Sequence, residues 1–125
     1  MGMKILVIDD SGLMRKMVLR ALRQADLDID ETFEAENGQE GLDVLQAKTP
    51  DIVLCDWNMP VMDGLEFVKQ ATAKTAVPVI MLTTEGTTDK VSEARTAGAR
   101  GYVTKPFTPE KLGEAIQQVI RAKSA

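Results

Sequence analysis

Short apolar runs alternate along the chain with stretches whose apolar residues recur at the helical period of 3.6. The runs predict strands at 5–9, 32–36, 51–55, 77–83 and 101–105. The helical period is clearest in two sets of residues, which are Met14, Met17, Val18, Ala21 and Leu22, and Leu112, Ala115, Ile116, Val119 and Ile120. Five strand–helix pairs in this order predict a doubly wound α/β domain, with five helices packed on a five-stranded parallel sheet.

Helix start signals agree with this division. Asn37 and Asp63 stand where N-caps are expected, and each has a glutamate three residues later, at Glu40 and Glu66. The segment 108–110, Thr-Pro-Glu, is likewise a start signal for the last helix, with an N-cap threonine followed by proline at the first helical position.

One predicted helix, 87–98, is weak, because its apolar stripe consists only of Val91, Ala94 and Ala97. It should bury little area and be among the less stable elements.

The strand patterns also indicate positions within the sheet. The runs at 5–9, 51–55 and 77–83 are apolar on both faces, as interior parallel strands are. The run at 32–36 alternates, and the run at 101–105 is short and partly polar, so both are expected at edges. The flavodoxin-like strand order 2-1-3-4-5 satisfies this, although the pattern does not derive that order uniquely.

Composition narrows the class of protein. The 125 residues suit one domain, and 44% apolar with 27% charged residues is ordinary for a globular chain. The net charge of −4 gives no indication of nucleic-acid binding, which favours a basic chain. The start of the chain does not read as a signal peptide, and no segment is apolar for long enough to span a membrane. Cys55 is the only cysteine, so we expect a reducing, cytoplasmic location.

The chain contains no histidine, which removes that residue as a general base, a metal ligand or a phosphate carrier. The candidate chemistry lies at the carboxyl ends of the predicted strands, where α/β sheets bind ligands. Asp9 and Asp10 follow the first strand, Asp56 the third, Thr83 the fourth and Lys105 the fifth. Three carboxylates and one ammonium would meet there.

Clustered carboxylates repel one another unless a cation joins them, and an all-oxygen cluster favours Mg²⁺. A carboxylate beside Mg²⁺, a lysine and a threonine hydroxyl can attack a phosphoryl group. We therefore predict Asp56 as a nucleophile that forms an aspartyl phosphate. Each residue singly has a simpler interpretation, such as helix capping or a turn, and only their coincidence at adjacent strand ends favours this chemistry.

Four separated motifs carry a resemblance to a known family over essentially the whole chain. They are Asp9-Asp10, CDWNMPVMDG at 55–64, MLTTE at 81–85 and GYVTKPF at 101–107. Together they resemble the response-regulator receiver domain of two-component systems, and most of all its single-domain chemotaxis members. The resemblance implies Asp56 as the phosphoacceptor. It also implies Asp10, Asp56 and the backbone carbonyl of Asn58 as ligands of Mg²⁺, or of Mn²⁺ in its place, with Asp9 acting through water.

The same resemblance assigns the switch residues. Thr83 and Lys105 would bind the phosphoryl oxygens, Tyr102 would turn inward after phosphorylation, and the Lys105–Pro106 bond would be cis. Asn58 and Glu85 would tune the phosphate lifetime. Thr84 departs from the common pattern, which often has alanine there, and its bulk would also affect that lifetime.

The implied partners follow from the missing histidine. A histidine kinase would be the phosphodonor, and the first helix near Arg15 and Lys16 is a candidate docking site, although a solvated helix face is an equal interpretation. A phosphatase is a further possible partner.

Since no effector domain follows the last helix, the output is expected to be binding of a protein target, such as the flagellar motor switch. The face containing the fourth helix, Tyr102 and the last helix would change. Such a chain is a signalling protein rather than an enzyme, and a monomer is the default expectation.

Two classes remain as alternatives, besides a receiver in a phosphorelay unrelated to chemotaxis. A phosphohydrolase of the haloacid-dehalogenase type needs an acid two residues after the nucleophile, where this chain has Asn58. A flavin-binding module needs a hydroxyl-rich loop after the first strand, where Asp9 and Asp10 would repel a phosphate.

Overall fold

The computed structural model describes residues 2–84 and 86–124. In these residues strands and helices alternate strictly. The strands are β1 (Met3–Ile8), β2 (Ile29–Ala35), β3 (Ile52–Cys55), β4 (Val79–Thr83) and β5 (Gly101–Thr104). The helices are α1 (Gly12–Gln24), α2 (Gly38–Lys48), α3 (Gly64–Lys74), α4 (Thr88–Ala97) and α5 (Pro109–Ser124).

The strands form one parallel sheet in the order β2-β1-β3-β4-β5, which confirms the predicted fold and the two predicted edge strands. Three strands begin two or more residues away from the prediction. β1 begins two residues earlier, at Met3, and β2 three residues earlier, at Ile29. β4 begins at Val79 rather than Val77. The shift of β4 has a simple cause, because Pro78 has no N–H to donate; its carbonyl still accepts from Val53 N at 3.0 Å.

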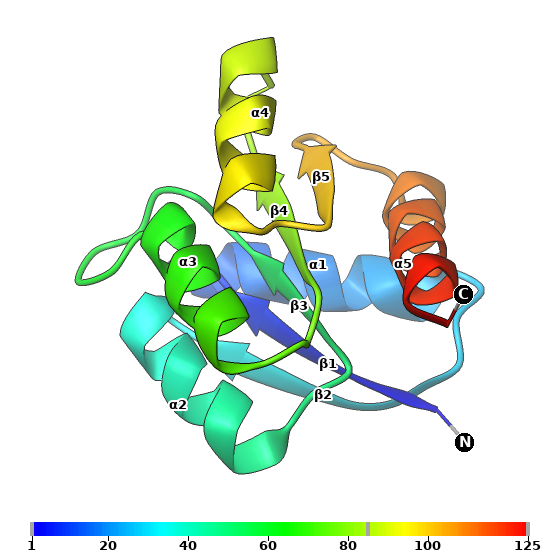
Figure 1. Cartoon of the computed structure of the whole chain (residues 1–125). Helices are drawn as coiled ribbons and strands as arrows, with labels where there is room; N and C mark the ends of the chain where they lie inside the picture. Colours follow the sequence, from blue (N-terminus) through cyan, green and yellow to red (C-terminus); the bar gives the residue numbers. More distant parts are fainter. Residues whose placement is uncertain (1, 85, 125) are drawn as a thin grey trace.

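Helices cover both faces of the sheet, with α1 and α5 on one face and α2, α3 and α4 on the other (Figure 1). The alternation of β1 divides its side chains between the two layers. Leu6 and Ile8 belong to the cluster under α2 and α3, while Ile5 and Val7 belong to the cluster under α1 and α5. All four are at most 1% exposed, so β1 is an interior strand on both faces. This rigid double layer supports the strand ends.

The predicted helix starts are confirmed. Side-chain oxygens of Asn37 and Asp63 accept from the backbone N–H of Glu40 and Glu66, each at 2.9 Å. Thr108 accepts from the N–H of Lys111 at 3.1 Å at the start of α5. These bonds satisfy N–H groups that the first helical turn leaves without a partner.

The small buried area predicted for α4 is confirmed, because Ala94 is its only buried residue. The helix is shorter than predicted by one residue at each end. Thr87 caps its start by accepting from Lys90 N at 3.2 Å, and Gly98 ends it at a φ of +123°. A positive φ at this position favours glycine, which explains why the helix ends there.

The segment between β3 and α3 contains an unfavourable backbone conformation. Val61 has a φ of +69°, which a β-branched residue rarely adopts, and its side chain is 83% exposed. The turn closes at Gly64, whose N–H donates to the Trp57 carbonyl at 2.7 Å. A Cβ on Gly64 would overlap the carbonyl oxygen of Asp56, so glycine is required beside the candidate nucleophile.

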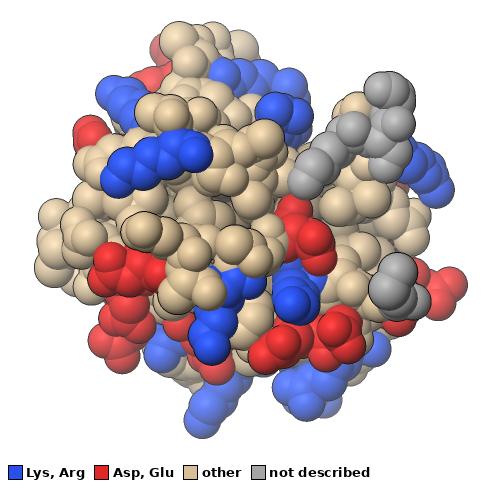
Figure 2. Space-filling model, turned by 60° about the horizontal axis from the view of Figure 1, so that its bottom comes forward, with Lys and Arg blue, Asp and Glu red and all other residues tan. Residues whose placement is uncertain are grey.

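The surface carries charges of both signs. On the face seen in Figure 2, the Lys and Arg side chains are interspersed with Asp and Glu. Among the described helices, none is both long enough and apolar enough to cross a bilayer.

Candidate functional site

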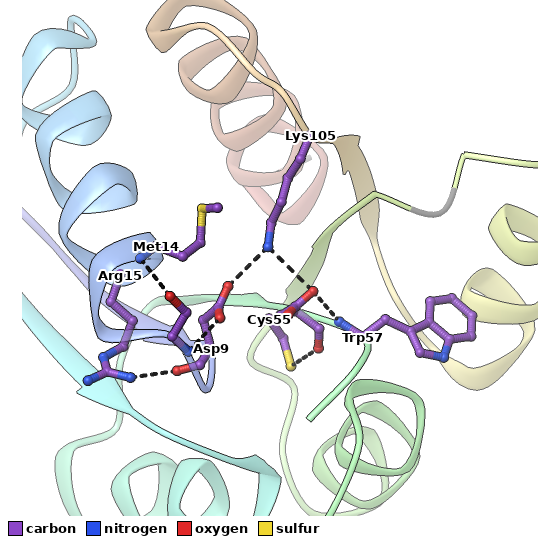
Figure 3. Close-up of polar contacts among 8 residues, drawn as sticks. Asp9, Met14, Arg15, Cys55, Trp57 and Lys105 are labelled. Atoms are coloured by element: carbon purple, nitrogen blue, oxygen red, sulfur yellow. Dashed lines mark hydrogen bonds and ion pairs between the residues drawn. The ribbon is translucent and has the colours of Figure 1, made fainter. Parts of the chain in front are cut away.

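Asp9 follows β1 directly, is 4% exposed and has a partner for each of its polar groups. Its backbone N–H donates to Ala35 O on β2 at 3.1 Å, and its backbone carbonyl accepts from Arg15 Nη1 at 2.6 Å. Its carboxylate accepts from Ser11 N at 2.9 Å and from Lys105 Nζ at 3.0 Å (Figure 3). Both the main chain and the carboxylate of Asp9 are therefore held in one position.

Asp56 follows β3, beside Asp9 in the sheet, because β1 and β3 are paired. Its N–H donates to Ile8 O at 2.9 Å, and its Oδ1 accepts from Trp57 N at 2.8 Å. Lys105 Nζ lies 3.5 Å from the same Oδ1. In Figure 3 the indole of Trp57 points away from Lys105, so Trp57 contributes its backbone to the site and its side chain to another contact.

Asp9, Asp10 and Asp56 each place one carboxylate oxygen within 4.8 Å of the others. Asp9 is buried, Asp56 is half-buried and Asp10 is exposed, so the cluster opens to solvent on the Asp10 side. The donor set contains only oxygen, with a formal charge of −3 against the single positive charge of Lys105. A hard divalent cation fits this chemistry, because such ions prefer carboxylate ligands and accept an open, hydrated side.

The electrostatic environment affects the proton affinity of Asp56. Burial raises the pKa of Asp56 above its ordinary value, and the charge of Asp9 raises it further. The Lys105 ammonium and the N–H of Trp57 lower that pKa, but the net direction is upward. The ionised carboxylate is therefore less stable here than in water, as expected of a group that gains from a nearby cation.

Thr83 and Lys105 reach the same edge of the sheet from β4 and β5. Thr83 is fully buried, and its backbone carbonyl accepts from Lys105 N at 2.8 Å. The Lys105 side chain is 11% exposed and contacts two of the three carboxylates. The Lys105–Pro106 bond is cis, the conformation that the resemblance implies. Tyr102 on β5 is partly buried against the core cluster under α2, α3 and α4.

The structure thus brings Asp9, Asp10, Asp56 and Lys105 together, with Thr83 on the adjacent strand end. Asn58 and Thr84, the predicted lifetime residues, are both exposed beside this edge. Glu85, the third of them, lies outside the described residues.

The stretch of α1 near Arg15 and Lys16, which is the predicted docking site, exposes Lys16 but largely covers Arg15. The Arg15 side chain is only 14% exposed, because its guanidinium donates from Nε to Glu34 Oε1 at 2.9 Å and from Nη1 to the Asp9 carbonyl. Lys16, its neighbour on α1, is exposed as expected. Arg15 therefore supports the site from within, and docking at this part of α1 stays a prediction.

Two residues near the site have roles that the sequence did not predict. Arg15 contacts the site rather than only the surface; the one sequence signal for this is Glu34, an acidic residue on the polar face of the alternating run at 32–36. Lys90 places its ammonium 4.9 Å from the centre of the Trp57 ring. No short motif signals this contact, because it joins α4 to a loop 33 residues earlier.

The site is thus an acidic cluster with a lysine at the carboxyl edge of a doubly wound parallel sheet. Residues 5–117 match the family described as the response regulator receiver domain, and the chain belongs to that family. The chain is similar to the chemotaxis protein CheY homolog of Campylobacter jejuni, with 43% identity over 94% of this chain and 92% of that protein. It is also similar to the chemotaxis protein CheY1 of Helicobacter pylori (strain J99), with 40% identity over 94% and 97% of the two chains. Among solved structures, the chemotaxis response regulator CheY4 of Vibrio cholerae has a TM-score of 0.85 at 38% identity, over 95% of this chain and 99% of that one.

Proposed function

We propose that this protein is a phosphorylation-controlled response regulator in which Asp56 accepts a phosphoryl group. The observation that supports this most directly is the position of its carboxylate. Asp56 shares a cluster of three carboxylates with Asp9 and Asp10, and Lys105 Nζ lies 3.5 Å from its Oδ1. A structural ion pair would not need two further carboxylates at the same strand ends, since like charges there are costly.

The acidic cluster is proposed to hold Mg²⁺, or Mn²⁺ in its place. Asp10 and Asp56 would supply carboxylate ligands and Asn58 its backbone carbonyl, while Asp9 would act through water. When bound, the ion neutralises carboxylate charge and polarises phosphoryl oxygens.

Phosphoryl transfer then uses the residues around Asp56. A carboxylate oxygen of Asp56 forms the new bond to phosphorus, and the bond from phosphorus to the donor nitrogen or oxygen breaks, with its electron pair leaving on the donor. Lys105 and the hydroxyl of Thr83 are proposed to bind the equatorial oxygens, where negative charge is spread in the transition state. The side chain of Lys105 already lies between Asp9 and Asp56.

Trp57 provides the test, because its N–H is bonded to the Asp56 carboxylate. We expect its fluorescence to change on adding Mg²⁺ and again, reversibly, on adding acetyl phosphate, with one phosphoryl group gained in intact mass. Asp56→Asn should lose the second response. Asp43→Asn, the same change at an exposed position of α2, should keep both. A parent chain that never gains mass with Mg²⁺ and acetyl phosphate would contradict the proposal.

The output is proposed to be a change of the face that contains α4, Tyr102 and the start of α5. Phosphorylation would draw Thr83 toward the phosphoryl group, and Tyr102 would turn inward. Two new charge-assisted hydrogen bonds, at about 1.5–3 kcal/mol each, would contribute roughly 3–6 kcal/mol. Shifting a two-state equilibrium from 1:99 to 99:1 needs about 5.5 kcal/mol. Phosphorylation would therefore shift the equilibrium strongly, and a target that prefers the active form would complete the shift.

The weak packing of α4 supports this location, because a helix with one buried residue costs little to move. We expect Tyr102→Ala to leave phosphorylation of Asp56 intact and to weaken binding of a phospho-specific target. Equal affinity of parent and variant for such a target would remove Tyr102 from the switch.

The partners are proposed by analogy with the similar chemotaxis proteins. The phosphodonor would be a histidine kinase, the target the flagellar motor switch, and a phosphatase would limit the signal together with Asn58, Thr84 and Glu85. The chain would act as a monomeric signalling protein rather than an enzyme. A phosphorelay outside chemotaxis is the second candidate. Deleting the gene and scoring swimming reversals discriminates between the two, because only the chemotaxis role predicts altered reversals in fully motile cells.

A further inference from the structure

The carboxyl end of β2 contacts Asp9 in two ways, although β2 contributes no residue to the acidic cluster. Ala35 O accepts directly from Asp9 N at 3.1 Å. Glu34, the residue before it, acts through Arg15, whose Nε donates to Glu34 Oε1 at 2.9 Å while its Nη1 donates to Asp9 O at 2.6 Å. We call the pair the Arg15–Glu34 clamp.

The clamp is built so that one side chain reaches both partners. Arg15 lies one turn into α1, and the guanidinium passes over the first residue of that helix, since a Cβ on Gly12 would lie 3.4 Å from Nη2. Different nitrogens of the planar fork serve the carboxylate and the carbonyl. The Glu36 carboxylate lies 3.9 Å from Nη2 and is the second carboxylate that faces the guanidinium, after that of Glu34.

The position of the accepted carbonyl is what connects the clamp to the site. The carbonyl of Asp9 lies at the start of the turn that leads to Asp10, and the other end of that turn is held by Ser11 N on Asp9 Oδ1. Fixing the Asp9 carbonyl therefore fixes the peptide plane between Asp9 and Asp10. The direction of that plane decides where both carboxylates of the β1–α1 turn point.

We infer that the Arg15–Glu34 clamp is a positioning device that holds the Asp9-Asp10 turn in its cation-binding geometry and so sets the affinity of the cluster for Mg²⁺. This rests on the proposed function, because it assumes that the cluster binds Mg²⁺. Arg15 and Glu34 touch neither the ion nor the phosphoryl group, and they act only through the main chain of Asp9. Outer-shell partners of this kind change metal affinity by about 10–100-fold when they are removed.

The test must separate two effects of removing Arg15 on Mg²⁺ affinity, the change in net charge and the loss of the contact that positions Asp9. Losing Arg15 alone removes a positive charge near the cluster, which by itself would favour binding of a cation. The double variant Arg15→Gln/Glu34→Gln removes one positive and one negative charge, so the net charge is unchanged. The matched control, Arg23→Gln/Glu31→Gln, makes the same two changes at exposed positions of α1 and β2 that lie away from the carboxyl ends of the strands.

The experiment is a Mg²⁺ titration of Trp57 fluorescence, with the chain otherwise metal-free. We expect the control to bind like the parent and Arg15→Gln/Glu34→Gln to bind about tenfold more weakly, the low end of the range because Asp9 is assigned an indirect role. Circular dichroism of each variant checks that it is folded at the titration temperature. A folded double variant with the affinity of the parent would overturn the inference.

A second variant covers the case in which the double variant does not fold. Arg15→Lys keeps the charge, but a single ammonium nitrogen replaces two separate donors, so we expect weaker Mg²⁺ binding from a folded chain. Unchanged affinity in Arg15→Lys, with the double variant unfolded, would show a role in stability alone and overturn the positioning role. A parent chain that binds no Mg²⁺ would overturn the proposed function itself, which is a different result from equal binding by parent and variant.

Discussion

Replacing Lys105 by methionine tests how the acidic cluster is balanced in the metal-free protein. Lys105 Nζ lies 3.0 Å from Asp9 Oδ2 and 3.5 Å from Asp56 Oδ1, and the three side chains are between 5% and 14% exposed. At an effective dielectric constant of about 20, these separations correspond to attractions of about 5.5 and about 4.7 kcal/mol. Most of that is offset by the cost of taking the charges out of water, but the variant leaves the carboxylates without their cation.

Removing one partner of a buried ion pair costs about 3–5 kcal/mol. We expect Lys105→Met to lower the free energy of unfolding by about 3 kcal/mol. This is the low end of the range, because the cluster opens to water at Asp10 and water can partly solvate the unpaired carboxylates. Urea denaturation followed by circular dichroism measures this. With a slope of about 1.5 kcal/mol per molar urea, the midpoint should fall by roughly 2 M. Lys69→Met, the same change on the exposed side of α3, should stay within about 0.5 kcal/mol of the parent.

The pH dependence gives an independent check on the cause. The pKa of Asp56 is already raised by burial, and Lys105 is the largest influence that lowers it, so Lys105→Met should raise it further. Between the ordinary carboxyl pKa and this higher folded-state pKa, the folded chain binds more protons than the unfolded chain, so its stability falls as pH rises. The deficit of the variant is therefore complete above the folded-state pKa and shrinks as pH falls toward about 4.

Mg²⁺ should reduce the difference in the free energy of unfolding between the parent and Lys105→Met, because a cluster without its lysine is stabilised more by a bound cation. The reasoning would be refuted if Lys105→Met lost less than about 1 kcal/mol of stability, or if its loss of stability were the same at all pH values. It would also be refuted if Lys105→Met were as stable as Lys69→Met. The carboxylates would then be stabilised by solvent rather than by Lys105.

Three further changes have expected outcomes that equilibrium denaturation can check. Val61→Asn should stabilise the chain by about 1 kcal/mol, since asparagine tolerates a positive φ and the exposed valine side chain buries little; unchanged stability would mean that this turn is not strained. Gly64→Ala should destabilise by about 2–3 kcal/mol, because its Cβ would overlap the Asp56 carbonyl, and a loss under about 0.5 kcal/mol would contradict that contact. Without metal, Asp56→Asn should raise stability at pH 7, because the ionised carboxylate is disfavoured there. This gain should disappear as pH falls and the parent carboxyl becomes neutral; a gain independent of pH would point to another cause.

Most of the fold could be predicted from the sequence, because periodicity and capping are local properties. The alternation of apolar runs with 3.6-period stretches determined the order of elements, and caps such as Asn37 and Asp63 located the helix starts. Element ends were less certain, as β2 and β4 show, because pairing with a neighbouring strand decides them. The residues at the carboxyl ends of parallel strands must share one edge, so Asp9, Asp56 and Lys105 could be placed together without a structure.

Only the tertiary structure decided what surrounds that edge. From the sequence Arg15 was a charge on a helix surface, yet the fold places it against the end of β2, where Glu34 and the Asp9 carbonyl bind it. The contact between Lys90 and Trp57 likewise joins elements that the sequence separates. The physical reason is the reach of the side chain. A long charged side chain has several rotamers of similar energy in isolation, and only the partners that packing brings within hydrogen-bond distance select one of them.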